Sequence, residues 1–278
     1  KNLIINGGFD VWQRGTSFTP VVNETYTADR WFSYRSSTSL STITKRTDAT
    51  GVPFINYIRG DNSIDSNTTW YQLTQRIEDY QHLLSKTVTL SFYIRASQSV
   101  SDMRIATNAG VTSSLFALTT NWVKQEITLA LGTGTVVSNG YLEIKLDKTT
   151  SEMPANTSID VAQVQLELGS VATDFEHRSY GEILADCQRY YWEVPETGVD
   201  GGYGYKGGTA SAFSFNSAST FPVKMRTTPT VVVSGGVLNG CSSYSVSVTK
   251  DGYISRVSPS STGAYRSYEQ KITFSAEL

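Results

Sequence analysis

The sequence predicts an all-β protein: an antiparallel jelly-roll β-sandwich over residues 1–178, a short connecting helix over 179–192 and a smaller C-terminal β domain over 193–278. Two observations lead to this prediction. Short stretches of alternating apolar and polar residues recur between loops rich in Gly, Asn, Ser and Thr, which is typical of antiparallel sheets. Charged residues make up only 17% of the chain while tyrosine occurs 16 times, a balance that favours extended β structure.

Two segments mark the ends of the sandwich. The first is N-L-I-I-N-G-G-F-D-V-W-Q-R-G-T near the N-terminus, and the second is V-A-Q-V-Q-L-E-L-G-S-V-A-T-D-F-E-H-R at 161–178. Apolar residues alternate with polar or small ones at Leu3 and Ile5 in the first and at Val164, Leu166 and Leu168 in the second. We therefore expect a strand at each end of the domain.

The clearest strands lie between Thr68 and Arg95. Alternation places Tyr71, Leu73 and Ile77 on the apolar face of one strand and Val88, Leu90, Phe92 and Ile94 on that of the next. The opposite faces carry Trp70, Gln72, Thr74 and Arg76, and then Thr89, Ser91, Tyr93 and Arg95. Further strands are expected at 102–107, 122–129 and 140–146, where the same alternation returns.

One helix is expected, from Tyr180 to Trp192, because apolar residues there recur at spacings of three and four after Ser179, a suitable cap. The glycine-rich stretch from Gly198 to Gly208 predicts a loose surface loop. Strands then return at 209–216, 229–234, 243–249, 252–257 and 268–277. We place the domain boundary near residue 179.

Composition argues against several classes of partner. The 23 basic residues nearly balance the 25 acidic ones and form no run, so we expect neither nucleic acid binding nor membrane insertion. Membrane spans need about 20 apolar residues in a row, which the chain lacks. Cys187 and Cys241 could form one disulfide, although we expect two free thiols. A chain that begins with Lys is expected to be a fragment of a longer protein.

Several segments, taken in order, resemble a known family. They are I-N-G-G-F-D-V-W-Q-R-G-T-S-F, Y-T-A-D-R-W, Q-R-I-E-D, L-S-F-Y-I-R-A-S, Q-L-E-L-G, A-T-D-F-E-H-R and C-Q-R-Y-Y. Over roughly residues 1 to 192 they resemble the carbohydrate-binding-module-like region of bacteriophage tail fibres and related virion proteins. F-P-V-K-M-R-T-T-P-T-V at Phe221 to Val231 and the closing F-S-A-E-L are similar to the C-terminal β domain of such fibres.

The resemblance implies a distal tail-fibre segment on the virion, outside the cell, that recognises bacterial surface polysaccharide or lipopolysaccharide during host attachment. It also implies a homotrimer that contacts other virion tail proteins. No enzyme activity and no required cofactor are expected. Two alternatives stay open: a purely structural virion fibre or decoration protein, and a polysaccharide-degrading tailspike.

The candidate ligand-binding residues are polar and aromatic side chains on the strand faces opposite the apolar stripes. An aromatic ring flanked by polar groups can stack on a sugar while its neighbours bond the hydroxyls. The candidates are Trp70, Gln72, Arg76, Tyr93, Arg95, Trp122 and Glu126. The alternative is that these residues pack against loops or another protomer, which is common for large aromatics. Trp12 and Trp31 are expected in the core, and Tyr244, Tyr253, Tyr265 and Tyr268 on a tyrosine-rich surface of the C-terminal domain.

A structural calcium is a further hypothesis. Asp10 and Asp160 stand at positions similar to those where jelly-roll carbohydrate modules hold this ion, although the first is usually Glu there. Calcium needs about six to eight oxygen ligands, of which two carboxylates supply a part.

Catalytic groups are scarce. With two histidines, His82 and His177, a His-based triad or a multi-His metal site is hard to assemble. A glycosidase needs a pair of carboxylates, for which Glu78, Asp79, Glu143 and Asp147 are available. Acidic residues at strand edges are more often solvated or protect the edge from aggregation, so we favour binding over catalysis.

Overall fold

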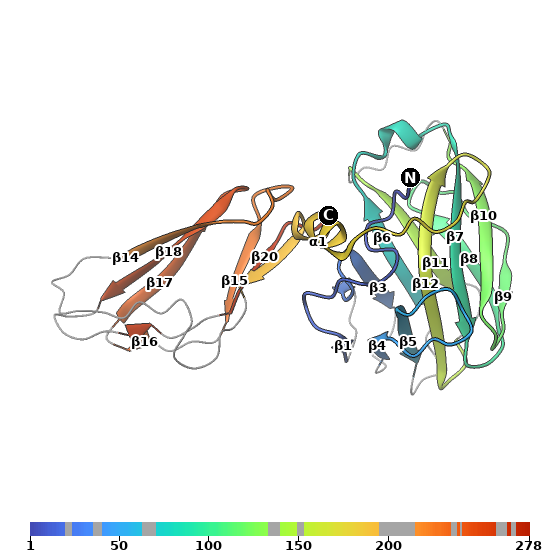
Figure 1. The fold of residues 1–278 in the computed structure, drawn as a ribbon, viewed down its shortest axis with the longest axis horizontal. Coiled ribbons are helices and arrows are strands. Elements are labelled where there is room, and N and C mark those ends of the chain that lie inside the picture. The colour runs from blue at the N-terminus through green and yellow to red at the C-terminus, as the bar shows by residue number, and fades with distance from the viewer. Residues whose placement is uncertain are drawn as a thin grey trace. The chain divides into compact units, whose positions relative to one another are not determined.

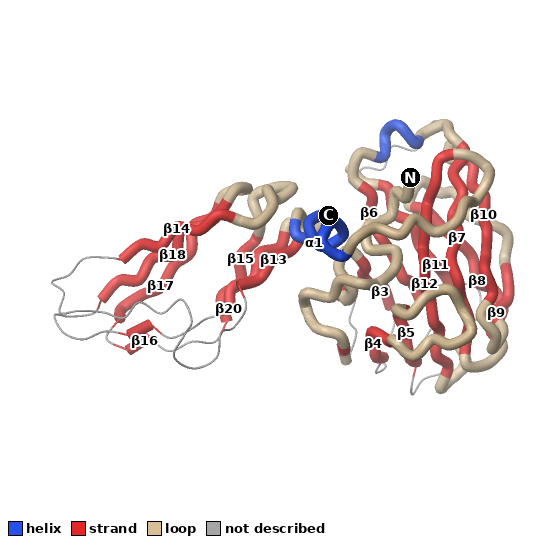
Figure 2. Tube along the Cα trace, viewed as in Figure 1, coloured by secondary structure: helices blue, strands red, loops and turns tan. Residues whose placement is uncertain are grey.

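The computed structural model describes residues 1–19, 24–35, 41–62, 71–132, 140–148, 153–194, 215–234, 238–239, 241–259, 266–267 and 271–278. The chain divides into two compact units, one of Lys1–Ile183 with Leu278 and the other of Leu184–Glu277. The division falls inside helix α1 (Tyr180–Gln188). Strands dominate both units (Figure 2).

The first unit contains two six-stranded antiparallel sheets (Figure 1). Sheet A has the order β1 (Ser17–Phe18), β4 (Ser41–Arg46), β5 (Tyr57–Asn62), β12 (Thr157–Leu168), β7 (Thr87–Ala96) and β10 (Val123–Ala130). Sheet B has the order β2 (Thr25–Tyr26), β3 (Trp31–Arg35), β6 (Tyr71–Ile77), β11 (Leu142–Lys148), β8 (Val100–Thr107) and β9 (Phe116–Leu118). A short 3₁₀ helix, η1 (Tyr80–Leu83), joins β6 to β7. Most connections cross between the sheets, as in a jelly roll, so the predicted fold class is confirmed.

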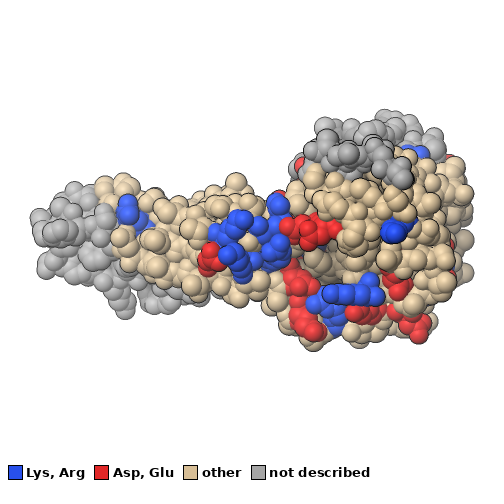
Figure 3. Space-filling view, turned by 90° about the horizontal axis from the view of Figure 1, so that it is seen from above, with Lys and Arg blue, Asp and Glu red and all other residues tan. Residues whose placement is uncertain are grey.

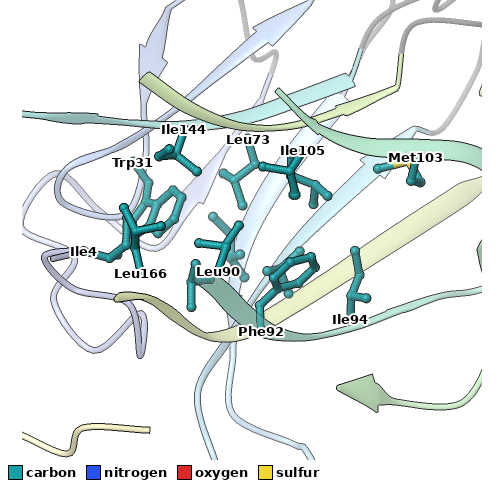
Figure 4. Packing of buried hydrophobic residues seen from close by; sticks show 14 of the residues in the cluster. Ile4, Trp31, Leu73, Leu90, Phe92, Ile94, Met103, Ile105, Ile144 and Leu166 are labelled. Carbon is teal, nitrogen blue, oxygen red and sulfur yellow. The ribbon is translucent and has the colours of Figure 1, made fainter. Parts of the chain in front are cut away.

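The core of the sandwich fills the space between the sheets (Figure 4). Sheet A contributes Leu90, Phe92, Ile94 and Leu166, and sheet B contributes Trp31, Leu73, Met103, Ile105 and Ile144. Alternation turns these side chains inward because successive residues of a strand point to opposite faces. Trp12 and Trp31 are both buried, as predicted, whereas Leu168 at the end of β12 is 58% exposed.

The predicted strand at Leu3 and Ile5 is wrong, because residues 4–8 form a turn. The side chain of Asn6 explains the turn. Its Oδ1 accepts hydrogen bonds from the backbone N–H groups of Asp10 (2.9 Å) and Val11 (3.0 Å), and its Nδ2 donates to the carbonyls of Val11 and Asp29. Asn6 itself adopts φ 57°, a left-handed conformation that asparagine tolerates better than most residues.

The second unit contains small antiparallel sheets. One has the order β13 (Tyr191–Val194), β20 (Lys271–Ser275) and β15 (Thr230–Ser234). Another has the order β14 (Phe215–Thr220), β18 (Gly252–Pro259) and β17 (Cys241–Val248), and β16 (Leu238–Asn239) pairs with β19 (Arg266–Ser267). Its core comprises Val194, Phe221, Met225, Tyr253, Ile272, Phe274 and Ala276.

Two predictions for this part of the chain need correction. Helix α1 ends at Gln188 rather than at Trp192, because Tyr191 and Trp192 form β13 and pair with β20, which satisfies their backbone groups. Tyr253 is a core residue, 6% exposed, and not part of a tyrosine-rich surface. Tyr265, Tyr268 and the predicted loop at 198–208 lie outside the described residues.

Ser179 caps α1 as predicted. The Ser179 hydroxyl and backbone N–H both donate to Glu182 Oε2, at 2.7 and 3.0 Å, and Glu182 N–H in turn donates to Ser179 Oγ at 3.4 Å. This reciprocal pair is a capping box, which satisfies backbone donors that the first helical turn leaves without partners.

Candidate functional site

The outer face of sheet A brings together polar and aromatic side chains of three neighbouring strands. In the register of the sheet, Tyr93 of β7 lies between Ala162 of β12 and Lys124 of β10. Two residues along β7, Arg95 lies opposite Asp160 of β12. Since Phe92 and Ile94 point into the core, Tyr93 and Arg95 point away from it.

A β-bulge interrupts this face at Gln163. The register between β12 and β7 shifts between Ala162 and Gln165, and Gln163 adopts φ 47° there. The Gln163 side chain is buried, at 6% exposed for the residue, and its Nε2 donates to the carbonyl of Pro53 at 3.3 Å. Bulges bend a strand and re-aim a side chain, and they are common beside functional sites.

An open hollow of about 320 Å³ lies over this part of the sheet. Ser91, Tyr93, Lys124 and Gln163 of sheet A line it, together with Pro53 from the loop before β5 and Asp174, Phe175 and His177 from the segment after β12. The lining thus offers the rings of Tyr93, Phe175 and His177 and several hydrogen-bonding groups. Both flanking segments are loops held on a rigid sheet, which is where binding residues concentrate.

Hydrogen bonds from β12 fix the segment after it. Glu167 accepts from the backbone N–H (2.9 Å) and hydroxyl (2.6 Å) of Thr173. Gln165 donates to the carbonyl of Asp174 (3.0 Å) and accepts from the N–H of Glu176 (2.8 Å). Phe175 is held between these anchors, and its ring meets that of His177 edge to face at 5.1 Å.

We expect the hold of Glu167 on this segment to weaken in acid. Burial raises the pKa of Glu167, but the hydrogen bonds from Thr173 and Gln165 and the positive charge of the N-terminus together lower it more, so the net pKa lies below its usual value. A carboxylate with a lowered folded pKa stabilises the protein above its unfolded pKa of about 4.3, and this contribution is lost as the pH falls through the folded value. Glu167→Ala should reproduce the loss at neutral pH, at a cost of about 1–2 kcal/mol.

Amide hydrogen exchange checks this prediction. In Glu167→Ala at pH 7, amides of residues 173–176 should exchange faster, while amides of β7 serve as the internal control and keep their wild-type rates. Wild-type protein titrated downward from pH 7 should show the same local change once the Glu167 carboxylate is protonated, after correction for the intrinsic exchange rate. Unchanged protection of 173–176 in the variant would contradict the role assigned to Glu167.

An aromatic cluster adjoins the hollow on its other side. Phe54 of the loop before β5 packs against Tyr93 (5.2 Å between ring centroids) and edge to face against Trp122 (4.9 Å). Trp122 also meets Tyr57 at 5.3 Å, and the guanidinium of Arg95 lies over the Trp122 ring at 4.7 Å. Tyr93 and Trp122 are therefore partly covered by a loop, as the alternative to ligand contact predicts.

The predicted ligand-binding residues do not form one site. Tyr93, Arg95, Trp122 and Glu126 lie on or next to sheet A, and Glu126 is exposed and pairs with Lys124 at 2.8 Å. Gln72 and Arg76 lie on β6 of sheet B, where both are buried. Trp70 lies outside the described residues. Most residues around the hollow were not among the predicted ligand-binding residues; these are Pro53, Phe54, Ser91, Lys124, Gln163, Asp174, Phe175 and His177.

Several charged residues of sheet B form ion pairs. Arg76 donates to Glu143 at 3.0 Å and to Glu24 at 2.9 Å, and its guanidinium lies over the Phe32 ring at 4.3 Å. Arg104 donates to Asp147 at 2.9 Å, and Gln72 donates to the same carboxylate at 3.0 Å. Two of the acidic residues considered for glycoside hydrolysis, Glu143 and Asp147, are thus engaged by cations. On the larger unit, basic and acidic groups lie next to one another (Figure 3).

The surroundings of Asp160 do not suit calcium. Arg59 donates to both oxygens of Asp160, at 2.7 and 2.8 Å, and Arg95 donates to one of them at 2.8 Å. A cation there would have to displace two guanidinium groups. Asp10 accepts from Asn56 at 2.6 Å, and its carbonyl accepts from Lys45 at 2.9 Å. Among the described residues, no group of three or more His, Cys, Asp or Glu side chains is placed to hold a metal.

No family model and no curated protein matches the chain. Solved structures resemble it in fold. A sugar-binding protein described from Bacteroides thetaiotaomicron has 17% identity and a TM-score of 0.42, covering 61% of this chain and 100% of its own. A CBM4 structure has 19% identity and a TM-score of 0.37, covering 59% and 98%. A Stig cyclase from Fischerella sp. TAU has 13% identity and a TM-score of 0.42, covering 62% and 99%. Such values carry no conclusion about function.

In the part of the chain that the structure describes, no helix is long and apolar enough to cross a membrane.

Proposed function

We propose that the sandwich unit binds carbohydrate through the hollow over β7, β10 and β12. The observation that carries this proposal is the lining itself: the rings of Tyr93 and Phe175 share one open space of about 320 Å³ with Ser91, Lys124, Gln163 and Asp174. Sugar rings have an apolar face that stacks on aromatic side chains and a rim of hydroxyls that needs donors and acceptors. A mostly preformed pocket with a few well-placed polar groups meets both needs.

The charges favour a neutral or amino sugar at this place. Lys124 is paired with Glu126 at 2.8 Å, so its positive charge is largely compensated. Asp174 adds a carboxylate to the lining, which would repel an acidic sugar. Ser91 and Gln163 are uncharged, and each can donate and accept hydrogen bonds.

We further propose that the chain is the receptor-binding part of a bacteriophage tail fibre, acting without catalysis as a homotrimer that attaches to glycans of the bacterial surface. The ordered sequence segments that resemble such fibres support this proposal. So do apolar residues that the second unit leaves exposed, since Val232 and Ile254 are 60% and 45% exposed. An open, mostly apolar hollow of about 380 Å³ over β14, β17 and β18 includes Ile254. Exposed apolar surface of this kind often marks a subunit interface, and three linked sites would raise avidity.

Calorimetry with a panel of delipidated bacterial lipopolysaccharides tests the proposed function. A panel member that binds the wild type should bind Tyr93→Ala at least about tenfold more weakly, because a stacked aromatic contributes about 0.5–1.5 kcal/mol beyond its buried area. Tyr180→Ala is the matched control, because Tyr180 is 59% exposed in α1 and does not line the hollow. This variant should bind the lipopolysaccharide with wild-type affinity.

Three other results would contradict the proposal. If no panel member binds the wild type, the structural virion protein becomes the better explanation. If reducing ends are released during the titration, the chain is a polysaccharide-degrading enzyme. If light scattering gives the mass of a single chain for the protein that binds glycan, the homotrimer is wrong while the binding site stands.

A further inference from the structure

The side chain of Phe54 fills a place beside the hollow that has the features of a sugar-stacking position. Phe54 is only 9% exposed, and its ring touches both Tyr93, which lines the hollow, and Trp122, which does not. The preceding residue, Pro53, also lines the hollow. Removal of the Phe54 ring would therefore extend the hollow from Tyr93 to the ring of Trp122.

Among the residues that the structure describes, the indole N–H of Trp122 has no hydrogen-bond partner. This N–H is buried. A buried donor without a partner costs about 1–3 kcal/mol, and tryptophan usually avoids this when buried. A ligand hydroxyl is an acceptor of the kind that this N–H lacks. The guanidinium of Arg95, 4.7 Å from the ring, lies over the same indole.

The loop that carries Phe54 is anchored by hydrogen bonds at its ends and has few hydrogen bonds between them. At one end Asp48 accepts from the Tyr57 hydroxyl at 2.7 Å, and at the other Asn56 donates to Asp10 at 2.6 Å. Between residues 49 and 55, one hydrogen bond is found among the described residues, from Gln163 Nε2 to the carbonyl of Pro53 at 3.3 Å. Apolar packing therefore keeps this loop on the sheet: Phe54 is buried in a cluster with Tyr57 and Ala162, and Ala49 and Val52 pack against that cluster.

We propose that Phe54 occupies a second sugar subsite, formed by Tyr93, Trp122 and Arg95, and that a bound glycan displaces it. In this subsite a pyranose ring takes the place of the Phe54 ring against Tyr93 and Trp122, and one of its hydroxyls accepts from the Trp122 indole N–H. Loop 49–55 moves outward about its anchors at Asp48 and Asn56. The subsite continues the hollow described above and rests on the carbohydrate-binding function proposed for it.

Substitution of Phe54 tests the proposal. In this proposal the displaced state is a minor population of the free protein. The apparent affinity is then the intrinsic affinity of the open state multiplied by the fraction of molecules that are open. Phe54→Ala removes the obstacle and should bind the same delipidated lipopolysaccharide about fivefold more tightly. Ile55→Ala is the matched control, because Ile55 is 68% exposed in the same loop and its loss should leave the affinity unchanged. Adding Trp122→Phe to Phe54→Ala should abolish the gain, since the indole N–H is then absent.

The outcomes separate this proposal from the one on which it rests. If Tyr93→Ala loses binding but Phe54→Ala binds with wild-type or lower affinity, the hollow stands and the second subsite is wrong. If neither wild type nor Phe54→Ala binds any polysaccharide of the panel, both proposals fail. Should Phe54→Ala not fold, Phe54→Leu keeps an apolar contact without the ring, and an affinity no higher than wild type would again overturn the subsite.

Discussion

Asp160→Ala is expected to lower the free energy of unfolding of the sandwich by about 3 kcal/mol. The carboxylate is 3% exposed and accepts three hydrogen bonds from Arg59 and Arg95, which lie on the strands to either side of it. Removing it leaves two guanidinium groups close together without their shared counter-ion. Their side chains are 23% and 30% exposed, so water compensates for part of the loss, and we expect the lower end of the range for a broken buried pair.

Urea unfolding checks this prediction against a matched variant. Glu126→Ala removes the carboxylate of an ion pair on the same sheet whose side chains are 35% and 50% exposed, and it should cost less than about 1 kcal/mol. Replacing all three residues by apolar ones, as Asp160→Leu with Arg59→Met and Arg95→Met, should recover most of the loss because no charge is then left without its partner. An Asp160→Ala variant no less stable than Glu126→Ala would show that the arginines do not depend on Asp160.

The strands of the sandwich could be predicted from sequence because apolar and polar residues alternate along them with a period of two. Leu90, Phe92 and Ile94 alternate with polar residues, and all three are buried as expected. Alternation also shows that Arg76 and Tyr93 point away from the core. It does not show which sheet a strand joins: β6 and β7 follow one another in the chain but belong to different sheets, so Arg76 and Tyr93 lie on opposite sides of the sandwich.

The bulge in β12 could be predicted from the sequence pattern, whereas the contacts of the loop that carries Phe54 could not. Val161 and Val164 are three residues apart and both buried, although strict alternation would place them on opposite faces. An extra residue between them, Gln163, resolves the conflict, so the break in period predicts a bulge. No local pattern links Phe54 to Tyr93 and Trp122, because that contact depends on how a loop returns across a sheet built from distant strands.

The bulge at Gln163 and the two flanking loop segments determine the shape of the hollow more than the regular strands do. The bulge turns Gln163 into the hollow, and the segments that carry Pro53 and Phe175 flank it. Each is tied to β12: Gln163 reaches Pro53, and Gln165 and Glu167 hold residues 173–176. A single strand thus positions both sides of the candidate site, and a change that displaces β12 should affect stability and binding together.

Gly7→Ala is such a change, and we expect it to destabilise the sandwich by about 3 kcal/mol. The N–H of Val164 donates to the carbonyl of Gly7 at 2.9 Å, which joins the N-terminal turn to β12 next to the bulge. A Cβ atom added at Gly7 would lie 2.0 Å from the carbonyl oxygen of Val164. Because both sides of this contact are backbone, neither can yield without breaking the hydrogen bond between them.

Alanine substitutions at two further glycines distinguish the steric clash of the added Cβ atom from the general effect of replacing a glycine. At Gly8 an added Cβ would meet Asp10 Oδ2 at 2.7 Å, a side-chain atom that can rotate away, so Gly8→Ala should cost less than Gly7→Ala. At Gly132 an added Cβ meets nothing within 4 Å, so Gly132→Ala should be neutral or slightly stabilising. Urea unfolding should therefore rank the variants in the order Gly132, Gly8 and Gly7 by increasing loss of stability. If Gly7→Ala unfolds at the same urea concentration as Gly132→Ala, the turn does not need its close approach to β12, and the expected link between this strand's position and glycan affinity loses its basis.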